Sequence, residues 1–411
     1  MLLPGTLRRW LPALGTAVPL IILPIAVLSL PLAAAKEMGL SERETASWIL
    51  ALYGLPGLLS LVLTIRYRQP LLLTGNFFVL IFIVSLGSSL SYPELIGASA
   101  LAGACVVLLG ALGLTRRLAD WIPAPIVFGL LAGAVMSFVS DIFGFLGEAP
   151  VLIGGTVLAY FLSLRILGSR LPAILPALIA GLAIAALAGH LGGASTRPSS
   201  PVAVLTVPEF SVQAIATATP VLVIIITLQS NLPSMVFLQN EGYRPPERVV
   251  NNVSGMGTLL GSLLGPAAVS LSLPVTALVA GPDAGEHQYR QRAVYLASGA
   301  VVLVALLAGI AAEIPEIIPL PLLLTLAGLA AVGVLANALQ EITRGPLLLG
   351  PLFAFAIALS DISLLGFGPF FWALAIGTGI SFLLERDELQ ELRSPVPVAG
   401  GRSKSQGGAT K

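Results

Sequence analysis

The sequence predicts an all-α, polytopic membrane protein with fourteen transmembrane helices, arranged as two inverted repeats of seven helices each. Three observations carry this prediction: an apolar composition, apolar segments of membrane-spanning length, and a local pattern that recurs 196 residues later. Of the 411 residues, 56% are hydrophobic and only 10% are charged, and the mean hydropathy is +0.96. Soluble proteins carry about a quarter charged residues. The chain therefore belongs in a lipid bilayer.

The polar composition excludes several classes of function. The formal charges nearly cancel at +1, so no broad basic face neutralises phosphates, and we expect no nucleic-acid partner. One cysteine, Cys105, and two histidines, His190 and His287, supply neither a disulfide framework nor a zinc or haem motif, so we expect no metal and no cofactor. The chain has no HExxH or Gly-x-Ser-x-Gly motif and no paired carboxylates inside a predicted span. We therefore do not expect an enzyme.

Each predicted span is a run of roughly 20 mostly apolar residues, the length that crosses the hydrocarbon core. The first run follows Arg8 and Arg9 and is too long for the core of a signal peptide, so we interpret it as a retained span. Polar residues then divide the chain into spans at 10–33, 44–65, 70–88, 93–114, 123–140, 150–168, 171–191, 211–235, 249–265, 267–282, 291–312, 317–339, 345–360 and 364–384.

The basic residues predict the orientation of these spans, because Lys and Arg are retained on the cytoplasmic side. With the amino terminus inside, 18 of the 21 basic residues fall on the inner side, and only Lys36, Arg43 and Arg197 fall outside. We expect a multi-pass protein of the inner membrane with both termini cytoplasmic. The predicted parts are a cytoplasmic N-terminus (1–9), a first repeat (10–193), an outer loop (194–210), a second repeat (211–384) and a disordered cytoplasmic tail (385–411).

The repeat rests on two short strings and on the helix count. PAPIVFGLLAG begins at Pro123, and PLPLLLTLAG begins 196 residues later at Pro319. The same offset carries Thr74 in the third span onto Ser270 in the tenth span. Seven crossings per half place the second half in the membrane with opposite orientation, and such inverted repeats are typical of secondary transporters.

Two of the spans are interrupted by polar, Gly or Pro residues. Thr74, Gly75 and Asn76 interrupt the third span, and Ser270 and Ser272 interrupt the tenth. We expect an extended stretch followed by a short helix in each case, because a break at membrane depth is tolerated only where protein or a cavity covers it. The N-termini of two such half-helices favour an anion such as a carboxylate. The alternative is that these residues only permit tight packing or a kink.

Further candidate residues lie in the third, fifth and eighth spans. Gln229, Ser230 and Asn231 are consecutive hydrogen-bonding residues near the end of the eighth span, and we expect their amides to orient a substrate. The alternative is a polar helix end at the membrane interface. Phe77 is placed to cover an aromatic ring. Asp141 is expected in an outer loop and becomes a candidate for proton coupling if the fifth span extends beyond its predicted end.

The chain resembles the BenE-type benzoate–proton symporters, which are similar in plan to nucleobase and sulfate permeases. The resemblance lies in ASWILALYGLPG (Ala46 to Gly57), the break after RQPLLLTGN, IPAPIVFGLLAGAV (Ile122 to Val135), the stretch from Val207 to Pro246 that contains ITLQSNLPSMVFLQNEGYRPP, AGPDA (Ala280 to Ala284) and LLGFGPFFWALAIG (Leu364 to Gly377). It implies fourteen helices in two inverted repeats, a core and a gate domain, and a substrate between the third, eighth and tenth spans.

The resemblance also implies the function. We expect a secondary active transporter of a small, aromatic carboxylate such as benzoate, working by alternating access with proton coupling. Its partners would be the substrate, H+ and the lipid bilayer, and a homodimer is compatible with this plan. A passive channel is the alternative from another class. A nucleobase or an inorganic anion carried by the same fold is a second alternative.

Overall fold

The computed structural model describes residues 28–86, 89–167, 172–192, 203–360 and 362–393, together with Ala13 and Leu20. Most of the first predicted span therefore lies outside the described residues, as do the segment 1–9, Asp361 and residues 394–411. The first half of the described chain contains α3 (Ser29–Glu37), α4 (Glu42–Ile49), η1 (Leu50–Gly54), α5 (Leu55–Tyr67), β1 (Leu73–Gly75), α6 (Phe77–Leu86), α7 (Tyr92–Leu112), α8 (Thr115–Trp121), α9 (Ala124–Glu148), α10 (Pro150–Leu167) and α11 (Ile174–Leu187).

The second half of the described chain also combines helices with one short strand. It contains α12 (Val212–Ile224), η2 (Ile225–Asn231), α13 (Leu232–Asn240), α14 (Glu247–Ser262), β2 (Val269–Leu271), α15 (Leu273–Ala280), η3 (Pro282–Ala284), η4 (His287–Tyr289), α16 (Gln291–Leu306), α17 (Ala308–Ala312), α18 (Ile314–Ile317), α19 (Leu320–Arg344), α20 (Leu349–Leu359), α21 (Pro369–Leu384) and α22 (Arg386–Arg393).

Five helices of the described chain are long and apolar enough to cross a membrane, and shorter apolar helices accompany them. The five are α7, α9, α19 and two composite helices, Glu42–Tyr67 and Val212–Asn240. Each composite helix contains a π-helical segment, η1 in the first and η2 in the second. Such a segment inserts an extra residue into the turn and redirects the side chains that follow, and it occurs often at functional sites.

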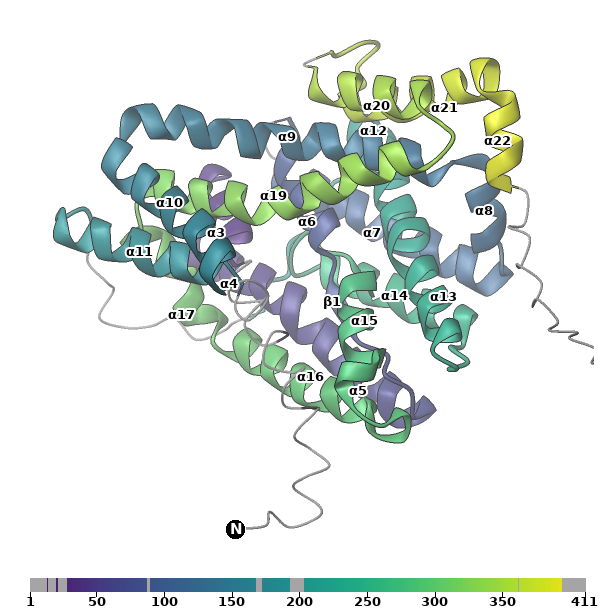
Figure 1. The fold of residues 1–411 in the computed structure, drawn as a ribbon, viewed down its shortest axis with the longest axis horizontal. Helices are drawn as coiled ribbons and strands as arrows, with labels where there is room; N and C mark the ends of the chain where they lie inside the picture. Colours follow the sequence, from purple (N-terminus) through teal and green to yellow (C-terminus); the bar gives the residue numbers. More distant parts are fainter. Residues whose placement is uncertain are drawn as a thin grey trace, which may run out of the picture.

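The helices belong to two groups, as their contacts and Figure 1 show. In the first group α9 packs on α19, α20 and α10, α20 packs on α21, and α10 packs on α11. Figure 1 shows α9 and α19 side by side across the upper half, with α20 and α21 above them. In the second group α7 packs on α14 and α12, and α16 packs on α5 and η1. The broken spans belong to the second group.

The offset of 196 residues recurs in the boundaries of the elements. Strand β1 starts at Leu73 and β2 at Val269, helix α6 starts at Phe77 and α15 at Leu273, and α9 and α19 match at both ends. The strands pair antiparallel, with Thr74 opposite Ser270. These two residues are also related by the offset.

The strand pair lies inside the protein, where its outer edges find hydroxyl partners. The Leu73 amide donates to Ser60 Oγ of α5 at 2.8 Å, and the Val269 amide donates to Thr258 Oγ1 of α14 at 2.9 Å. Leu73 and Val269 are almost completely buried. Because an unpaired backbone group in a membrane costs several kcal/mol, these hydroxyls allow extended chain at this depth. The prediction of an extended stretch followed by a short helix is confirmed in both spans.

Several predicted boundaries are wrong. Helix α9 continues to Glu148, so Asp141 lies within a helix and not in a loop. The predicted eleventh span divides at Leu307 into α16 and α17. The predicted disordered tail begins with helix α22.

The Glu385 carboxylate, just before α22, accepts hydrogen bonds from the amides of Leu348, Leu349 and Gly350 at the start of α20. Burial acts to raise the pKa of Glu385, but these hydrogen bonds outweigh it and hold the pKa below its usual value. The carboxylate therefore ties the start of α20 to the end of α21.

Candidate functional site

A cavity of about 730 Å³ lies between the two groups of helices. From the second group it is lined by β1, η2 and the starts of α6 and α15; from the first group it is lined by the start of α9, the end of α10 and a long face of α19. Most of its lining is apolar. Because both groups contribute walls, a movement of one group against the other would change the cavity.

Six of the nine predicted substrate residues line this cavity: Thr74, Gly75, Phe77, Gln229, Ser230 and Ser272. The other three, Asn76, Asn231 and Ser270, lie behind the wall, where they are at most 3% exposed. The structure thus brings six of these residues to one cavity and places the other three behind its wall, where they support it.

Asn76 connects three of the elements around the cavity. Its Nδ2 donates to Ser230 Oγ of η2 and to Ser270 Oγ of β2, each at 2.8 Å. Its Oδ1 accepts from the amide of Val79, three residues further along α6, at 3.1 Å. The side chain is thus the N-cap of α6 and also fixes η2 and β2 relative to that helix.

Asn231 forms a hydrogen bond with the backbone of β2 and two with side chains of α14. Its Oδ1 accepts from the Leu271 amide at 2.9 Å, and its Nδ2 donates to Asn251 Oδ1 at 2.9 Å and to Ser254 Oγ at 3.1 Å. These bonds join η2, β2 and α14. The expectation that Asn231 faces the substrate is not supported by this geometry, because the extra residue of the π-helical turn points Asn231 towards α14 and Gln229 towards the cavity.

Gln229 has the side chain most available to a ligand. It is 8% exposed and lines the cavity, and neither its Oε1 nor its Nε2 has a hydrogen-bond partner in the structure. A buried amide without a partner costs about 1–3 kcal/mol per unsatisfied group. A bound molecule that offers a hydrogen-bonding group there would remove this cost.

The N-termini of the two half-helices, α6 and α15, both lie at the cavity but differ in their side-chain caps. The start of α6 is capped by Asn76. At the corresponding position of α15 stands Ser272, whose side chain makes no cap hydrogen bond. Pro274, the second residue of α15, has no N–H, but the other amides of the first turn remain without a side-chain cap. The first turn of α15 therefore has no side-chain cap, whereas Asn76 caps one amide of α6.

Aromatic side chains form a second part of the lining. Phe77, Phe78 and Phe128 lie around the cavity together with Tyr53 of η1. Of these only Phe77 was predicted. Tyr53 lies in the ASWILALYGLPG string, but nothing in a single apolar sequence marks Phe128, which enters the lining because α9 packs next to α6.

One face of α19 extends the cavity towards an end of the molecule. Gly333, Asn337 and Glu341 follow one another at intervals of four residues along this face. Glu341 forms an ion pair with Arg344 one turn further along. The predicted span ended at residue 339, so this polar face was not predicted. The spacing of Asn337 and Glu341 was the available signal.

Asp141 does not line the cavity. It is exposed on α9 and lies close enough to Glu37 of α3 for the two carboxylates to repel one another. The described residues also contain no group of His, Cys, Asp and Glu side chains that could hold a metal ion.

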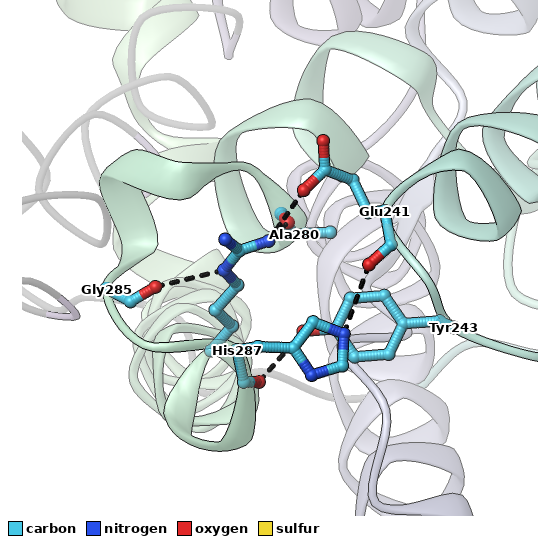
Figure 2. Close-up of polar contacts among 6 residues, drawn as sticks. Glu241, Tyr243, Ala280, Gly285 and His287 are labelled. Atoms are coloured by element: carbon cyan, nitrogen blue, oxygen red, sulfur yellow. Dashed lines mark hydrogen bonds and ion pairs between the residues drawn. The ribbon is translucent and has the colours of Figure 1, made fainter.

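A second polar cluster holds the far end of α15, and Figure 2 shows it. Arg290 is buried and donates to the carbonyl of Ala280, the last residue of α15, to the carbonyl of Gly285 at 3.0 Å and to Glu241 Oε2 at 2.7 Å. The His287 ring stacks on Tyr243 with 4.1 Å between centroids. The cluster therefore joins the end of α15 to the chain that follows α13.

Comparison with known proteins identifies the family of the chain. The family model for BenE, the benzoate membrane transport protein, matches residues 12–383. The chain belongs to this family. A benzoate membrane transport protein of Acinetobacter baylyi is 27% identical over 363 residues, which cover 85% of this chain and 89% of that protein. The inner membrane protein YdcO of Escherichia coli is 25% identical over 354 residues, with 85% and 90% covered.

Solved structures show the same fold at low sequence identity. The transmembrane domain of the cyanobacterial bicarbonate transporter BicA aligns with a TM-score of 0.51 at 16% identity, over 95% of this chain and 98% of that chain. The murine anion transporter Slc26a9, in its inward-facing state, aligns with a TM-score of 0.63 at 14% identity, over 94% of this chain and 69% of that chain. The protein is thus a multi-pass membrane transporter with the SLC26-like fold, and not an enzyme.

Proposed function

We propose that this protein is a secondary active transporter of a small aromatic carboxylate such as benzoate. The observation that carries the proposal is the cavity between the two helix groups, in which the unpartnered amide of Gln229 lies beside an uncapped helix N-terminus and aromatic side chains. The name of the relative from Acinetobacter baylyi supports the same class of substrate.

The proposed binding mode uses the polar and the aromatic parts of the lining together. The amides of the first turn of α15 hold the carboxylate, because a helix N-terminus favours negative charge. The Gln229 amide donates a further hydrogen bond, with Thr74 and Ser272 beside it. Phe77 covers the ring. Asn76, Asn231 and Ser270 act as positioning residues that hold these groups in place.

The proposed architecture is the predicted one of fourteen spans in two inverted seven-helix repeats, 10–193 and 211–384. The matching boundaries of β1 and β2, α6 and α15, and α9 and α19 support it. The helices α9 to α11 and α19 to α21 would form the gate, and the other group would form the core. Both termini would be cytoplasmic in an inner membrane, as the name of the Escherichia coli relative suggests.

In this orientation the described conformation is open towards the cytoplasm. The lining reaches Leu164, Pro172 and Glu341, which lie next to the predicted cytoplasmic residues Arg165 and Arg344. Alternating access then consists of a rocking movement of the gate against the core that closes this side and opens the other. Asp141 is the proposed carrier of the coupled proton, because a carboxylate within a membrane helix is costly without such a role.

Uptake of radiolabelled benzoate into proteoliposomes tests the proposed site. We expect Gln229→Ala to fold normally and to lower uptake strongly, because it removes the amide that the ligand completes. Asn76→Ala should lower uptake and also the melting temperature, because it removes two side-chain hydrogen bonds and a helix cap. The control is Gln340→Ala on the exposed side of α19. Wild-type uptake by both variants would disprove this site, and flux that does not saturate would indicate a channel.

A further inference from the structure

The proposed inverted repeat predicts which residues line the cavity when the transporter is open to the side opposite to the one described. In an inverted repeat the two halves exchange conformations when the transporter changes the side to which it is open. Residues of one half that line the cavity in the described conformation are replaced, in the opposite conformation, by the equivalent residues of the other half. For each residue that lines the cavity in the described conformation, the residue 196 positions away in the other half is therefore expected to line it in the opposite conformation.

The present lining contains one long polar face from the gate, Gly333, Asn337 and Glu341 of α19. The counterparts 196 residues earlier are Ser137, Asp141 and Phe145 of α9. They occupy the same positions in a helix of the same 25-residue length. Ser137 and Asp141 are exposed in the described structure, as Gly333 and Asn337 are. The surroundings of the two faces also correspond, because α19 contacts α3 and α9 contacts η2.

A second pair of residues is related by the same offset of 196. Pro233 at the start of α13 lines the present cavity, and its counterpart is Glu37 at the end of α3. Glu37 is the residue that lies close to Asp141. Glu37 of α3 and Asp141 of α9, both counterparts of cavity-lining residues, are thus close enough for the charge of Asp141 to act on Glu37.

We infer that the face of α9 formed by Ser137, Asp141 and Phe145 lines the outward-open entrance, through which the carboxylate substrate reaches Gln229. The inference rests on the proposed function, since it uses alternating access between inverted repeats. It places Asp141 in the substrate pathway in the opposite conformation and outside it in the present one. Glu37 of α3 borders the same entrance.

Reciprocal locking of the two entrances tests the inference. Gly333→Trp fills a position where an added Cβ meets no atom within 4 Å, and we expect it to hold the inner entrance open. We expect Ser137→Trp, at the counterpart position, to hold the outer entrance open. Each is combined with a single cysteine, Asp141→Cys or Asn337→Cys, in a Cys105→Ser background. A membrane-impermeant thiol reagent is applied from the outside to the first cysteine and from the inside to the second.

We expect Ser137→Trp to raise the labelling of Asp141→Cys several-fold and to lower that of Asn337→Cys, and Gly333→Trp to do the reverse. Two controls are Gly299→Trp, which also has no atom within 4 Å of an added Cβ, and Phe143→Cys, an exposed position on another face of α9. Labelling of Asp141→Cys that is the same with Ser137→Trp as with Gly299→Trp would overturn the inference.

A second measurement does not depend on the tryptophan variants folding. Saturating benzoate should change the labelling of Asp141→Cys and Asn337→Cys in opposite directions and leave Phe143→Cys unchanged. A response at Asn337→Cys alone would overturn the inference and leave the proposed function standing. No response at either cysteine, together with absent benzoate uptake by the parent protein, would contradict the proposed function itself.

Discussion

Gly75 lies so close to the π-helical segment η1 that no larger residue fits. A Cβ at this position would lie 2.3 Å from the carbonyl oxygen of Leu52. The obstacle is backbone, which cannot turn aside as a flexible side chain can. The close approach brings β1 and η1 together at the cavity, so the absence of a side chain at Gly75 shapes the site directly.

We therefore expect Gly75→Ala to lower both the melting temperature and benzoate uptake, with a loss of about 1–3 kcal/mol in stability from overpacking. Gly299→Ala is the matched control, since an added Cβ there meets nothing within 4 Å. Circular-dichroism melts and uptake in proteoliposomes measure the two effects. Equal melting temperatures and equal uptake for Gly75→Ala and Gly299→Ala would contradict the close contact between β1 and η1.

The polar residues of the broken spans show how far the sequence predicts a site. Gln229, Ser230 and Asn231 were identified because hydrogen-bonding side chains inside a membrane need partners. Which of the three faces the cavity depends on the π-helical turn of η2, and a one-residue insertion in the hydrogen-bond ladder leaves no mark in an apolar sequence. The region was therefore predictable, but the division between ligand-facing Gln229 and supporting Asn231 was not.

At the scale of elements, α15 is a short helix fixed at both ends. Its start follows β2, which Asn231 and Thr258 hold by hydrogen bonds to the backbone. Its end is held by Arg290, whose guanidinium binds two carbonyls and the Glu241 carboxylate (Figure 2). A cation at the end of a helix also interacts favourably with the helix dipole. The orientation of the proposed anion-binding end thus depends on contacts one helix length away.

Arg290→Gln should lower the free energy of unfolding by about 2 kcal/mol, because it leaves buried carbonyls and a carboxylate without their charged partner. Arg290→Lys should recover only part of this, since an ammonium group cannot reproduce the forked geometry of the guanidinium. Arg344→Gln is the control: its ion pair with Glu341 is exposed, and such pairs contribute little. Thermal melting in detergent provides the comparison, and equal losses at Arg290 and Arg344 would contradict the role of the cluster.

At the scale of the whole molecule, the sequence predicted an all-α membrane protein, and the offset of 196 residues recurs in the boundaries of several elements. The repeat was predicted from Pro123 and Pro319, and the structure places α9 and α19 one residue after each of them. The ends of helices were less predictable: α9 passes through Asp141, and α22 forms where disorder was expected. The first error arose because Asp141 was interpreted as a loop residue, and the second because the tail is rich in Ser, Gly and Pro; a helix end is decided by its caps and packing.

The predicted orientation can be measured with single cysteines in a Cys105→Ser background. Val207→Cys lies at an exposed position before α12, and Asn240→Cys lies at an exposed position at the end of α13. We expect an impermeant thiol reagent added to intact cells to label only Val207→Cys, and the same reagent added to inside-out vesicles to label only Asn240→Cys. The opposite pattern would invert the topology and would make the described conformation open to the outside.

The pairing of β1 with β2 also has a consequence for biogenesis. During synthesis β1 leaves the ribosome almost two hundred residues before the strand that completes its hydrogen bonds. Until then its amides and carbonyls need water, the insertion machinery or a neighbouring helix, because lipid offers them no partner. The first half on its own should consequently be a poor substrate for stable insertion. Two fragments divided in the loop before α12 and expressed together should assemble, whereas either fragment alone should be degraded.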